Sequence, residues 1–164
     1  MTKSPVSSDR YYYAGGKRIE LSPADDLCAV SDPEKAGFEP LATEIGRSLG
    51  GGLRLLSKGE LAVQKFTNPS ICKYPVFRSH GAILVALPEV RIEESRVSKW
   101  EKLNNWLDKH RDDVTILSRD DDRLVLSPVS GSGADALTIA NDLTEEIGPE
   151  MAQARFIRVT PRPN

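Results

Sequence analysis

The residue types that carry out acid–base or nucleophilic catalysis are sparse in this chain. Its two histidines are His80 and His110. His80 directly follows Ser79, but a serine–histidine–aspartate triad needs three groups that converge in space, and adjacency along the chain does not provide them. His110 lies between two basic residues at the expected end of a helix, where a cation interacts favourably with the helix dipole. We therefore predict that the protein is not an enzyme and has no catalytic residues.

A run of three aspartates, Asp120, Asp121 and Asp122, suggests a cation site at first sight. Calcium-binding loops place oxygen ligands at alternate positions around a glycine at the tight bend, and this run has neither feature. Aspartate is also common in solvated turns, because its side chain hydrogen-bonds to nearby backbone groups. We interpret the run as a turn between two strands, and we predict no metal site.

A glycine-containing loop at 131–133 follows one predicted strand and opens a predicted helix. Backbone N–H groups at such a position can bind phosphate. The loop lacks the Lys-Ser/Thr pair of a P-loop and the third glycine of a dinucleotide-binding fingerprint. Ser132 as the helix N-cap, with Asp135 in the first turn, accounts for these residues without a ligand. We predict no bound cofactor.

The overall charge argues against a nucleic-acid partner. The 164 residues include 22 Lys and Arg against 24 Asp and Glu, a net charge of −2. The tyrosines at 11–13 lie near Lys17 and Arg18 and could stack on bases, but strand alternation sends Tyr12 to the opposite face from its neighbours. The two cysteines, Cys28 and Cys72, are too few for a disulfide scaffold or a structural zinc site.

Composition and hydropathy favour a soluble globular protein. Hydrophobic residues make up 39% of the chain and charged residues 28%. The longest apolar run, 82–88, is far shorter than the roughly 20 residues needed to cross a bilayer. The N-terminus lacks the basic-then-apolar pattern of a signal peptide. We predict no membrane partner and a cytoplasmic location, or secretion if an upstream signal has been removed.

The first half of the chain is predicted to be a β-rich α+β subregion over residues 10–80, after a disordered lead-in at 1–9. Gly15 and Gly16 can adopt the positive φ of a tight hairpin. Leu41, Ile45 and Leu49 recur every four positions and predict a helix. The expected elements are a hairpin with strands at 11–13 and 18–21, strands at 27–30, 53–56 and 61–66, a helix at 39–49 and a loop at 67–80.

The second half, residues 81–160, has a clearer rhythm. Apolar residues from 97 to 107 place one stripe on a helix, and those from 136 to 147 place another. The expected elements are strands at 82–87, 114–117, 124–126 and 154–159, and helices at 93–110 and 134–147. Their order is that of a ferredoxin-like (split βαβ) α+β fold. We predict an antiparallel sheet with both helices on one face, an N-terminal hairpin and helix extension, and an extended tail at 161–164.

Two passages of the chain share a distinctive pattern of apolar residues and turns. The first is the opening segment 11–21, YYYAGGKRIEL. The second runs from RLVL at 123–126, through the predicted second helix, to AQARFIRV at 152–159. Together they resemble the N-terminal prodomain of subtilisin-like serine proteases, most of all the fervidolysin-type prodomain. The resemblance implies a small α/β unit whose open sheet face packs on surface helices of the protease, and a last strand that continues into the active-site cleft.

This resemblance implies a partner and a set of contact residues. The partner is the catalytic domain of a subtilisin-like serine protease, in cis or in trans, for which the chain is an intramolecular chaperone and inhibitor. An apolar open sheet face would supply the larger contact, and residues 154–164 would be the substrate-like segment. The acidic turn would lie near the N-termini of partner helices. The expected contact residues are Phe156, Arg158, Val159, Thr160, Pro161, Arg162, Pro163, Asn164, Asp120, Asp121 and Asp122.

A second hypothesis comes from a different class of protein. The chain would be a ferredoxin-like protein-interaction or ligand-sensing module of a multidomain regulator, with the 131–133 loop as the ligand contact. Binding of phosphate or a nucleotide confined to that loop would favour this hypothesis. Inhibition of a protease that weakens after truncation at Val159 would favour the prodomain.

Overall fold

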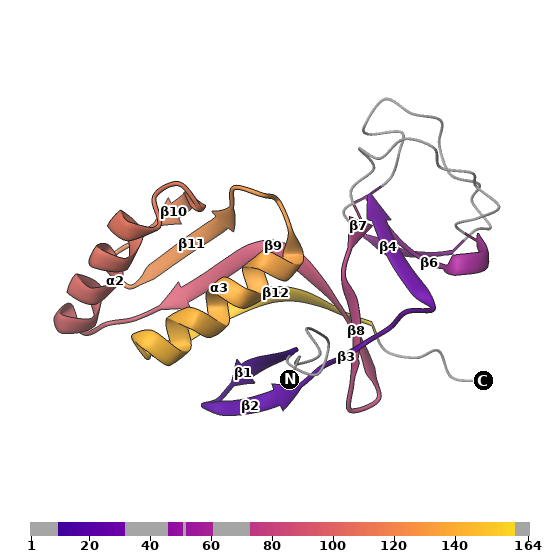
Figure 1. Cartoon of the computed structure of the whole chain (residues 1–164), viewed down its shortest axis with the longest axis horizontal. Coiled ribbons are helices and arrows are strands. Elements are labelled where there is room, and N and C mark those ends of the chain that lie inside the picture. The colour runs from indigo at the N-terminus through magenta and orange to yellow at the C-terminus, as the bar shows by residue number, and fades with distance from the viewer. Residues whose placement is uncertain (1–9, 32–45, 51, 61–72, 160–164) are drawn as a thin grey trace, which may run out of the picture. The chain divides into compact units, whose positions relative to one another are not determined.

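The computed structural model describes residues 10–31, 46–50, 52–60 and 73–159. It has an α+β fold in which the strands pair mostly antiparallel and helices are few (Figure 1). The chain divides into two compact units. Unit 1 comprises residues 1–21 and 86–156, and unit 2 comprises residues 22–85 and 157–164. The long strands β9 (Ala82–Glu93) and β12 (Met151–Val159) contribute residues to both units.

The sheet of unit 1 centres on β9. β10 (Val114–Arg119) pairs antiparallel with β11 (Arg123–Pro128), β11 pairs antiparallel with β9, and β12 also pairs with β9. From β9 onward the elements follow one another as strand, helix, strand, strand, helix, strand. The predicted order of elements in this half of the chain is therefore confirmed.

β9 changes partner along its length. Residues 82–85 pair with β8 (Val76–Ser79), and residues 90–93 pair with β11. Pro88 directly follows the predicted end of this strand at residue 87, and it lies between the two paired stretches. Its missing N–H therefore removes no bond from either ladder. For this reason the strand continues to Glu93, past the predicted end at residue 87.

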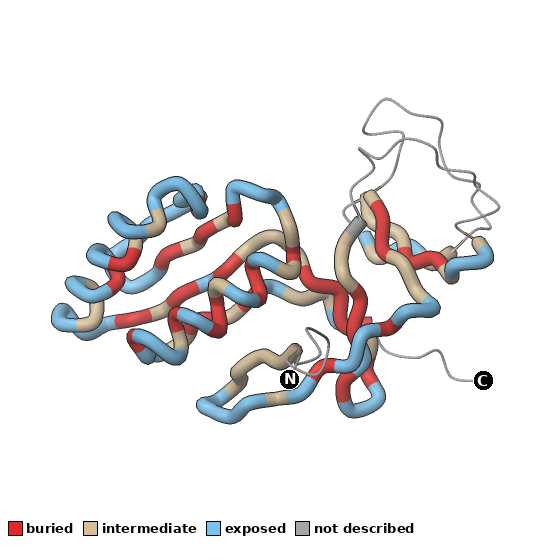
Figure 2. The backbone as a smooth tube through the Cα atoms, viewed as in Figure 1, coloured by how far each residue is buried: buried red, intermediate tan, exposed pale blue. Residues whose placement is uncertain are grey.

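Strand alternation gives the sheet of unit 1 two different faces. Ile92 of β9 lies opposite Leu124 of β11, and both side chains are fully buried. Arg91 and Glu93, on either side of Ile92, project to the opposite face because successive strand residues alternate. One face is therefore apolar and covered, and the other carries charged side chains. Buried residues alternate with more exposed ones along β11 (Figure 2).

Two helices, α2 (Val97–Lys109) and α3 (Gly133–Glu146), pack on the apolar face. Arg119 of β10 lies opposite Leu124, so it shares this face, and it donates a 2.6 Å hydrogen bond to Asn104 of α2. Thr144 of α3 donates a 3.4 Å hydrogen bond to the Ala152 carbonyl of β12. The helix side chains buried here are Leu103, Trp106, Ala136, Leu137, Ala140 and Leu143. Neither helix is long and apolar enough to span a membrane.

The N-terminal hairpin is part of unit 1. β1 (Tyr11–Ala14) and β2 (Lys17–Glu20) pair antiparallel around two glycines with positive φ, which confirms the predicted turn. Asn141 of α3 donates a 2.9 Å hydrogen bond to the Tyr11 carbonyl. The hydroxyls of Tyr11 and Tyr13 both donate to the Glu145 carboxylate, at 2.7 and 2.8 Å. These bonds attach the hairpin to α3.

Unit 2 contains a second antiparallel sheet in the order β5-β6-β4-β7. Its strands are β5 (Arg47–Gly50), β6 (Leu53–Ser57), β4 (Leu27–Ser31) and β7 (Lys73–Tyr74). β8 pairs with the short β3 (Ser22–Pro23) and with the first part of β9. One hydrophobic cluster of buried residues in this unit comprises Ala24, Ala29, Leu55, Val76, Val85 and Val159. The strands predicted at 27–30 and 53–56 are confirmed.

Two predictions for the first half of the chain were wrong where the structure tests them. The end of the predicted helix at 39–49 is the strand β5, because Arg47 pairs with Leu55 of β6 and the glycines at 50 and 52 form a turn with positive φ. The end of the predicted loop at 67–80 is the strand β8, because it pairs with β9. In both segments long-range pairing outweighs local periodicity. Residues 39–45 and the predicted strand at 61–66 lie outside the described residues.

Candidate functional site

The charged face of the unit 1 sheet forms a hollow of about 530 Å³. Both described helices lie on the opposite face, so this hollow opens to solvent. We call this surface the open face. Its charged lining residues are Glu89, Arg91, Glu93, Asp120 and Arg123, and its apolar ones are Leu117, Val125 and Met151.

Ion pairs cross the open face. The Glu89 carboxylate pairs with Arg91 at 3.2 Å and with Arg155 of β12 at 3.3 Å. Arg123 pairs with Glu93 at 3.7 Å. The arginine side chains are about half exposed, and such pairs contribute only about 0 to 1 kcal/mol each. The expectation of an apolar open face is therefore wrong for unit 1, because most of the residues that line this face are charged.

β10 carries two exposed apolar side chains. Leu117 lines the hollow of the open face and is 53% exposed, whereas Ile116 lies opposite the buried Leu126, on the helix side of the sheet, and is 47% exposed. The ladder to β11 is irregular between Ile116 and Ser118, which turns Leu117 out of the regular alternation. Within the described residues β10 pairs with β11 alone and ends the sheet. This edge offers backbone hydrogen-bonding groups next to apolar surface.

The acidic turn lies at the end of the open face, between β10 and β11. The Asp120 N–H donates a 2.8 Å bond to the Arg123 carbonyl and closes the turn. Asp120 itself lines the hollow, and the side chains of Asp121 and Asp122 are exposed beside it. The turn predicted for this run is confirmed, and it brings three carboxylates to one end of a surface that faces solvent.

Glu94, whose side chain is buried, links this turn to the start of α2. The Glu94 N–H donates a 2.9 Å bond to the Asp122 carbonyl. The Glu94 side chain, fully buried, accepts bonds from the Arg96 guanidinium at 2.8 Å and from the backbone N–H of Glu150 at 3.1 Å. The Arg96 side chain is the main cause that lowers the pKa of Glu94 to about 2. Glu94 thus joins the acidic turn, α2 and the segment before β12. The periodicity of the sequence does not predict this role, because it does not distinguish Glu94 from an exposed glutamate.

The C-terminal strand places its predicted contact residues in different surroundings. The Phe156 ring packs against Tyr12, with 5.1 Å between centroids. Arg158 is exposed, whereas Val159 is 4% exposed in the core of unit 2. The predicted contact residues 160–164 lie outside the described residues. Of the described members of the set, the acidic turn and Arg158 present accessible side chains.

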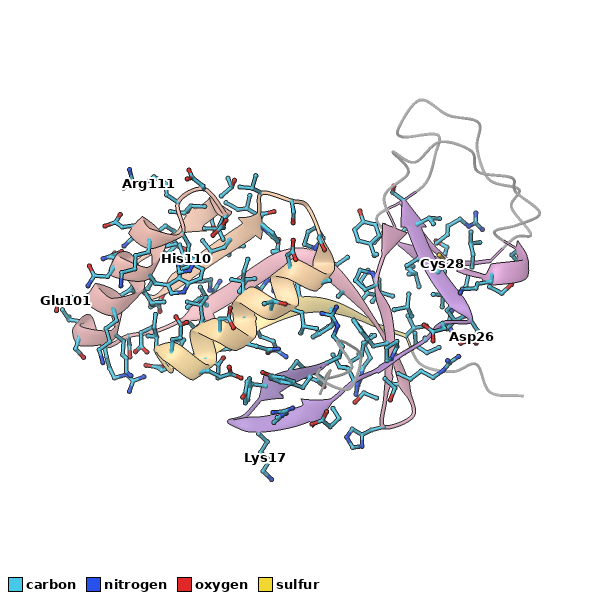
Figure 3. All side chains as sticks on the ribbon, in the orientation of Figure 1. Lys17, Asp26, Cys28, Glu101, His110 and Arg111 are labelled. Atoms are coloured by element: carbon cyan, nitrogen blue, oxygen red, sulfur yellow. The ribbon has the colours of Figure 1, made fainter. Side chains whose placement is uncertain are left out.

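Of the serine and histidine considered for catalysis, Ser79 is the last residue of β8 and His80 lies in the turn to β9. Ser79 is buried and His80 is exposed, with a φ of 48°. In the described ranges no group of three or more His, Cys, Asp or Glu side chains is placed to hold a metal ion. Figure 3 labels His110, which is half-buried, and Glu101 and Arg111, which are exposed.

A second hollow of unit 1, of about 460 Å³, lies where the end of α2 meets the start of α3. We call it the acidic cavity, because its ionisable lining residues are Asp112, Asp113, Asp135, Asp142 and His110. Sequence reasoning missed it, although the four-residue spacing of Trp106 and His110 along a helix was a signal. The neighbouring N-cap prediction is confirmed, since Ser132 Oγ accepts a 3.3 Å bond from the Asp135 N–H.

The surroundings of the 131–133 loop oppose phosphate binding. Asp135 lies two residues after the loop, in the first turn of α3, and its carboxylate accepts a 2.6 Å bond from Ser130 Oγ. The carboxylates of the acidic cavity add to the negative charge on the same side. No protein-family model, no curated protein and no solved structure matches this chain.

Proposed function

We propose that the chain is a non-catalytic prodomain that acts as chaperone and inhibitor of a subtilisin-like serine protease, and that its second half has the ferredoxin-like arrangement. The strand order β10-β11-β9, with β12 also beside β9, is consistent with that arrangement. The observation that carries the functional proposal is the open face with the acidic turn at its end. It offers a broad surface and concentrated negative charge within one unit.

The contact with the protease would combine two kinds of interaction. Helices of the protease would lie on the open face, with their N-termini at Asp120, Asp121 and Asp122, because the helix dipole favours negative charge there. Arg91, Arg123 and Arg155 would exchange part of their weak internal pairs for acidic groups of the partner. Leu117 would be buried at the edge of the contact. A surface of mixed charge gives orientation and specificity rather than large affinity by itself.

The last strand would connect this contact to the active-site cleft. β12 ends at Val159, and the five residues that follow include Pro161 and Pro163. Proline favours an extended chain but provides no N–H donor, so main-chain bonds in the cleft would come from the other tail residues. Because such a tail binds only the folded protease, it would favour folding by mass action and also block substrate.

The test is inhibition of a subtilisin-like protease by the purified chain, measured as hydrolysis of a chromogenic peptide. Truncation after Val159 should weaken inhibition strongly. Replacement of the three turn aspartates by asparagine should weaken it about tenfold, since each carboxylate at a helix N-terminus contributes about 0.3 to 1 kcal/mol. The matched control replaces the exposed acids Glu101 and Asp108 by their amides and should inhibit normally. Full protease activity at saturating protein, or steady cleavage of the chain, would refute the proposal.

A second candidate function is the ligand-sensing module. The observation that favours it is the acidic cavity, a hollow with ionisable and aromatic side chains next to the 131–133 loop. This function requires no protease and depends on a different part of unit 1. Direct binding measurements on the isolated chain separate it from the prodomain proposal.

A further inference from the structure

Two stacked aromatic rings form one wall of the acidic cavity. The rings of Trp106 and His110 lie 4.0 Å apart between centroids, at an interplanar angle of 17°. His110 Nδ1 is 2.8 Å from the Trp106 carbonyl oxygen. Because a carbonyl oxygen only accepts, Nδ1 carries a proton in this bond and donates it. The wall is therefore an aromatic surface in which this bond fixes the His110 ring.

Negative charge surrounds this wall. Four carboxylates, those of Asp112, Asp113, Asp135 and Asp142, come from the turn after α2 and from α3, and His110 is the one base among the described lining residues, which include no Lys or Arg. Burial raises the pKa of Asp142 and the nearby acids of α3 raise it further, whereas His110 lowers it. The cavity is thus rich in acceptors and short of donors. Such a site disfavours anions and favours a group with several N–H donors and a positive charge.

The spacing of these groups distinguishes an organic cation from a metal ion. A metal ion needs its ligand atoms within about 2 to 2.6 Å of one point. In the described part of the chain no three His, Cys, Asp or Glu side chains approach one another closely enough for this. A planar guanidinium has five donors in a fixed fork, which can reach separate carboxylates and stack on an aromatic ring.

Two further features of the lining point to a ligand larger than a bare cation. Trp106 is 6% exposed, and its indole Nε1–H is buried without a hydrogen-bond acceptor. An unsatisfied buried donor costs about 1 to 3 kcal/mol, so an acceptor brought to it would be stabilising. Val129 at the cavity is 61% exposed, and Ile139 lines it as well. These side chains can cover the methylene groups of a ligand.

We propose that the acidic cavity binds a small organic cation: a guanidinium group on a short alkyl chain that also carries a neutral carbonyl acceptor. Carboxylates of the cavity accept from the guanidinium, which lies near the Trp106–His110 wall, and the alkyl chain packs on Val129 and Ile139. The carbonyl oxygen satisfies the Trp106 indole donor. This inference deepens the ligand-sensing function and is independent of the prodomain proposal. The same chemistry occurs in a free arginine derivative and in an arginine residue of a peptide.

The test follows the two indole N–H signals of the chain by nuclear magnetic resonance during titration with L-argininamide. Trp100 is the internal reference, because its indole N–H donates a 2.7 Å bond to the Glu94 carbonyl and lies outside the cavity lining. We expect a saturable shift of the Trp106 signal and little change at Trp100. L-citrullinamide, the neutral analogue, should bind at least tenfold more weakly. A blocked tripeptide with a central arginine tests whether the cavity binds an arginine residue within a peptide or only a free arginine derivative.

Variants assign the binding to the cavity. Asp142→Asn and Asp112→Asn should each weaken argininamide binding about tenfold, equivalent to about 1.4 kcal/mol. The matched control is Asp108→Asn, an exposed carboxylate of α2 outside the cavity lining. An unchanged Trp100 signal shows that each variant is folded. If citrullinamide binds as tightly as argininamide, the cavity is a ligand site but its ligand need not be a cation, and the cationic class is overturned. If neither compound nor the peptide shifts the Trp106 signal, the cavity is not a ligand site for this class and the whole proposal is overturned. A shift with inorganic phosphate instead overturns the cationic class.

Discussion

Replacement of Glu94 by glutamine should destabilise unit 1 by about 2 to 3 kcal/mol at neutral pH. The Glu94 carboxylate accepts hydrogen bonds from the backbone N–H and the guanidinium of Arg96, each at 2.8 Å, and from the Glu150 N–H at 3.1 Å. A glutamine amide has one acceptor oxygen, and its nitrogen would face these donors. Loss of one partner of a buried pair costs about 3 to 5 kcal/mol. The side chain of Arg96 is 50% exposed, which lowers the expected value.

The same substitution should remove much of the acid sensitivity of unit 1. Arg96 lowers the pKa of Glu94 from 4.5 to about 2. At about 1.4 kcal/mol per pKa unit, this difference corresponds to about 3 kcal/mol before solvent screening and about 2 after it. Because the pKa is lower in the folded state, this stabilisation is complete above the unfolded-state pKa and is lost as the pH falls through about 2. The affected window is therefore roughly pH 5 to 2.

The assay is urea unfolding followed by tryptophan fluorescence at several pH values between 7 and about 3. The two tryptophans of the chain, Trp100 and Trp106, both lie in α2, so the signal reports on unit 1. The control is Glu93→Gln, which removes a 44% exposed carboxylate 3.7 Å from its arginine partner and should cost less than about 0.5 kcal/mol. The reasoning is refuted if Glu94→Gln is as stable as this control, or if it keeps the wild-type pH dependence.

Further predictions concern a turn, a helix cap and a hydrogen-bonded tyrosine. Gly46→Ala should destabilise unit 2 by about 2 to 4 kcal/mol, because φ is +73° and the new Cβ would lie 2.6 Å from a carbonyl oxygen of β6. Gly50→Ala is the control, because φ is +84° there but the space around it is open, and it should lower the free energy of unfolding by only about 1 kcal/mol. Equal rates of hydrogen exchange in β6 of the two variants would contradict the predicted clash at Gly46. Ser132→Ala should cost about 1 kcal/mol in the fluorescence assay, and no measurable loss would show that the cap bond is unimportant. The hydrogen bond to Glu145 raises the pKa of Tyr11 to about 12, so its stabilisation is present below pH 10 and is lost as the pH rises toward 12. In an ultraviolet titration, Glu145→Gln should return the pKa of Tyr11 toward its ordinary value of 10. An unchanged high pKa would exclude the Glu145 carboxylate as the cause.

The elements of the second half could be predicted because their local patterns are strong. The apolar stripe of α2 and the dense apolar spacing of α3 each repeat over several helical turns. The Ser132 cap and the aspartate turn depend on chemistry within a few residues. The boundaries were less accurate. β9 continues past Pro88 because the ladder to β8 ends before this residue and the ladder to β11 begins after it.

The first half was harder because its elements depend on distant partners. The four-residue spacing of Leu41, Ile45 and Leu49 is typical of a helix, yet Leu49 lies in the strand β5. This segment is a strand because it pairs with β6, and the spacing of three residues carries no information about that distant pairing. The same holds for β8, a short strand whose identity comes from its ladder to β9.

The sequence by itself determined the apolar strand at the start of β9, the amphipathic stripes of both helices and the turn between β10 and β11. These features follow from interactions between residues a few positions apart. Only the tertiary structure decided that the second face of the sheet is charged, that Glu94 is buried beneath the acidic turn, and that four aspartates surround one cavity beside two stacked rings. Each of these arrangements joins residues separated by tens of positions, and their proximity depends on how strands and helices pack rather than on any local pattern.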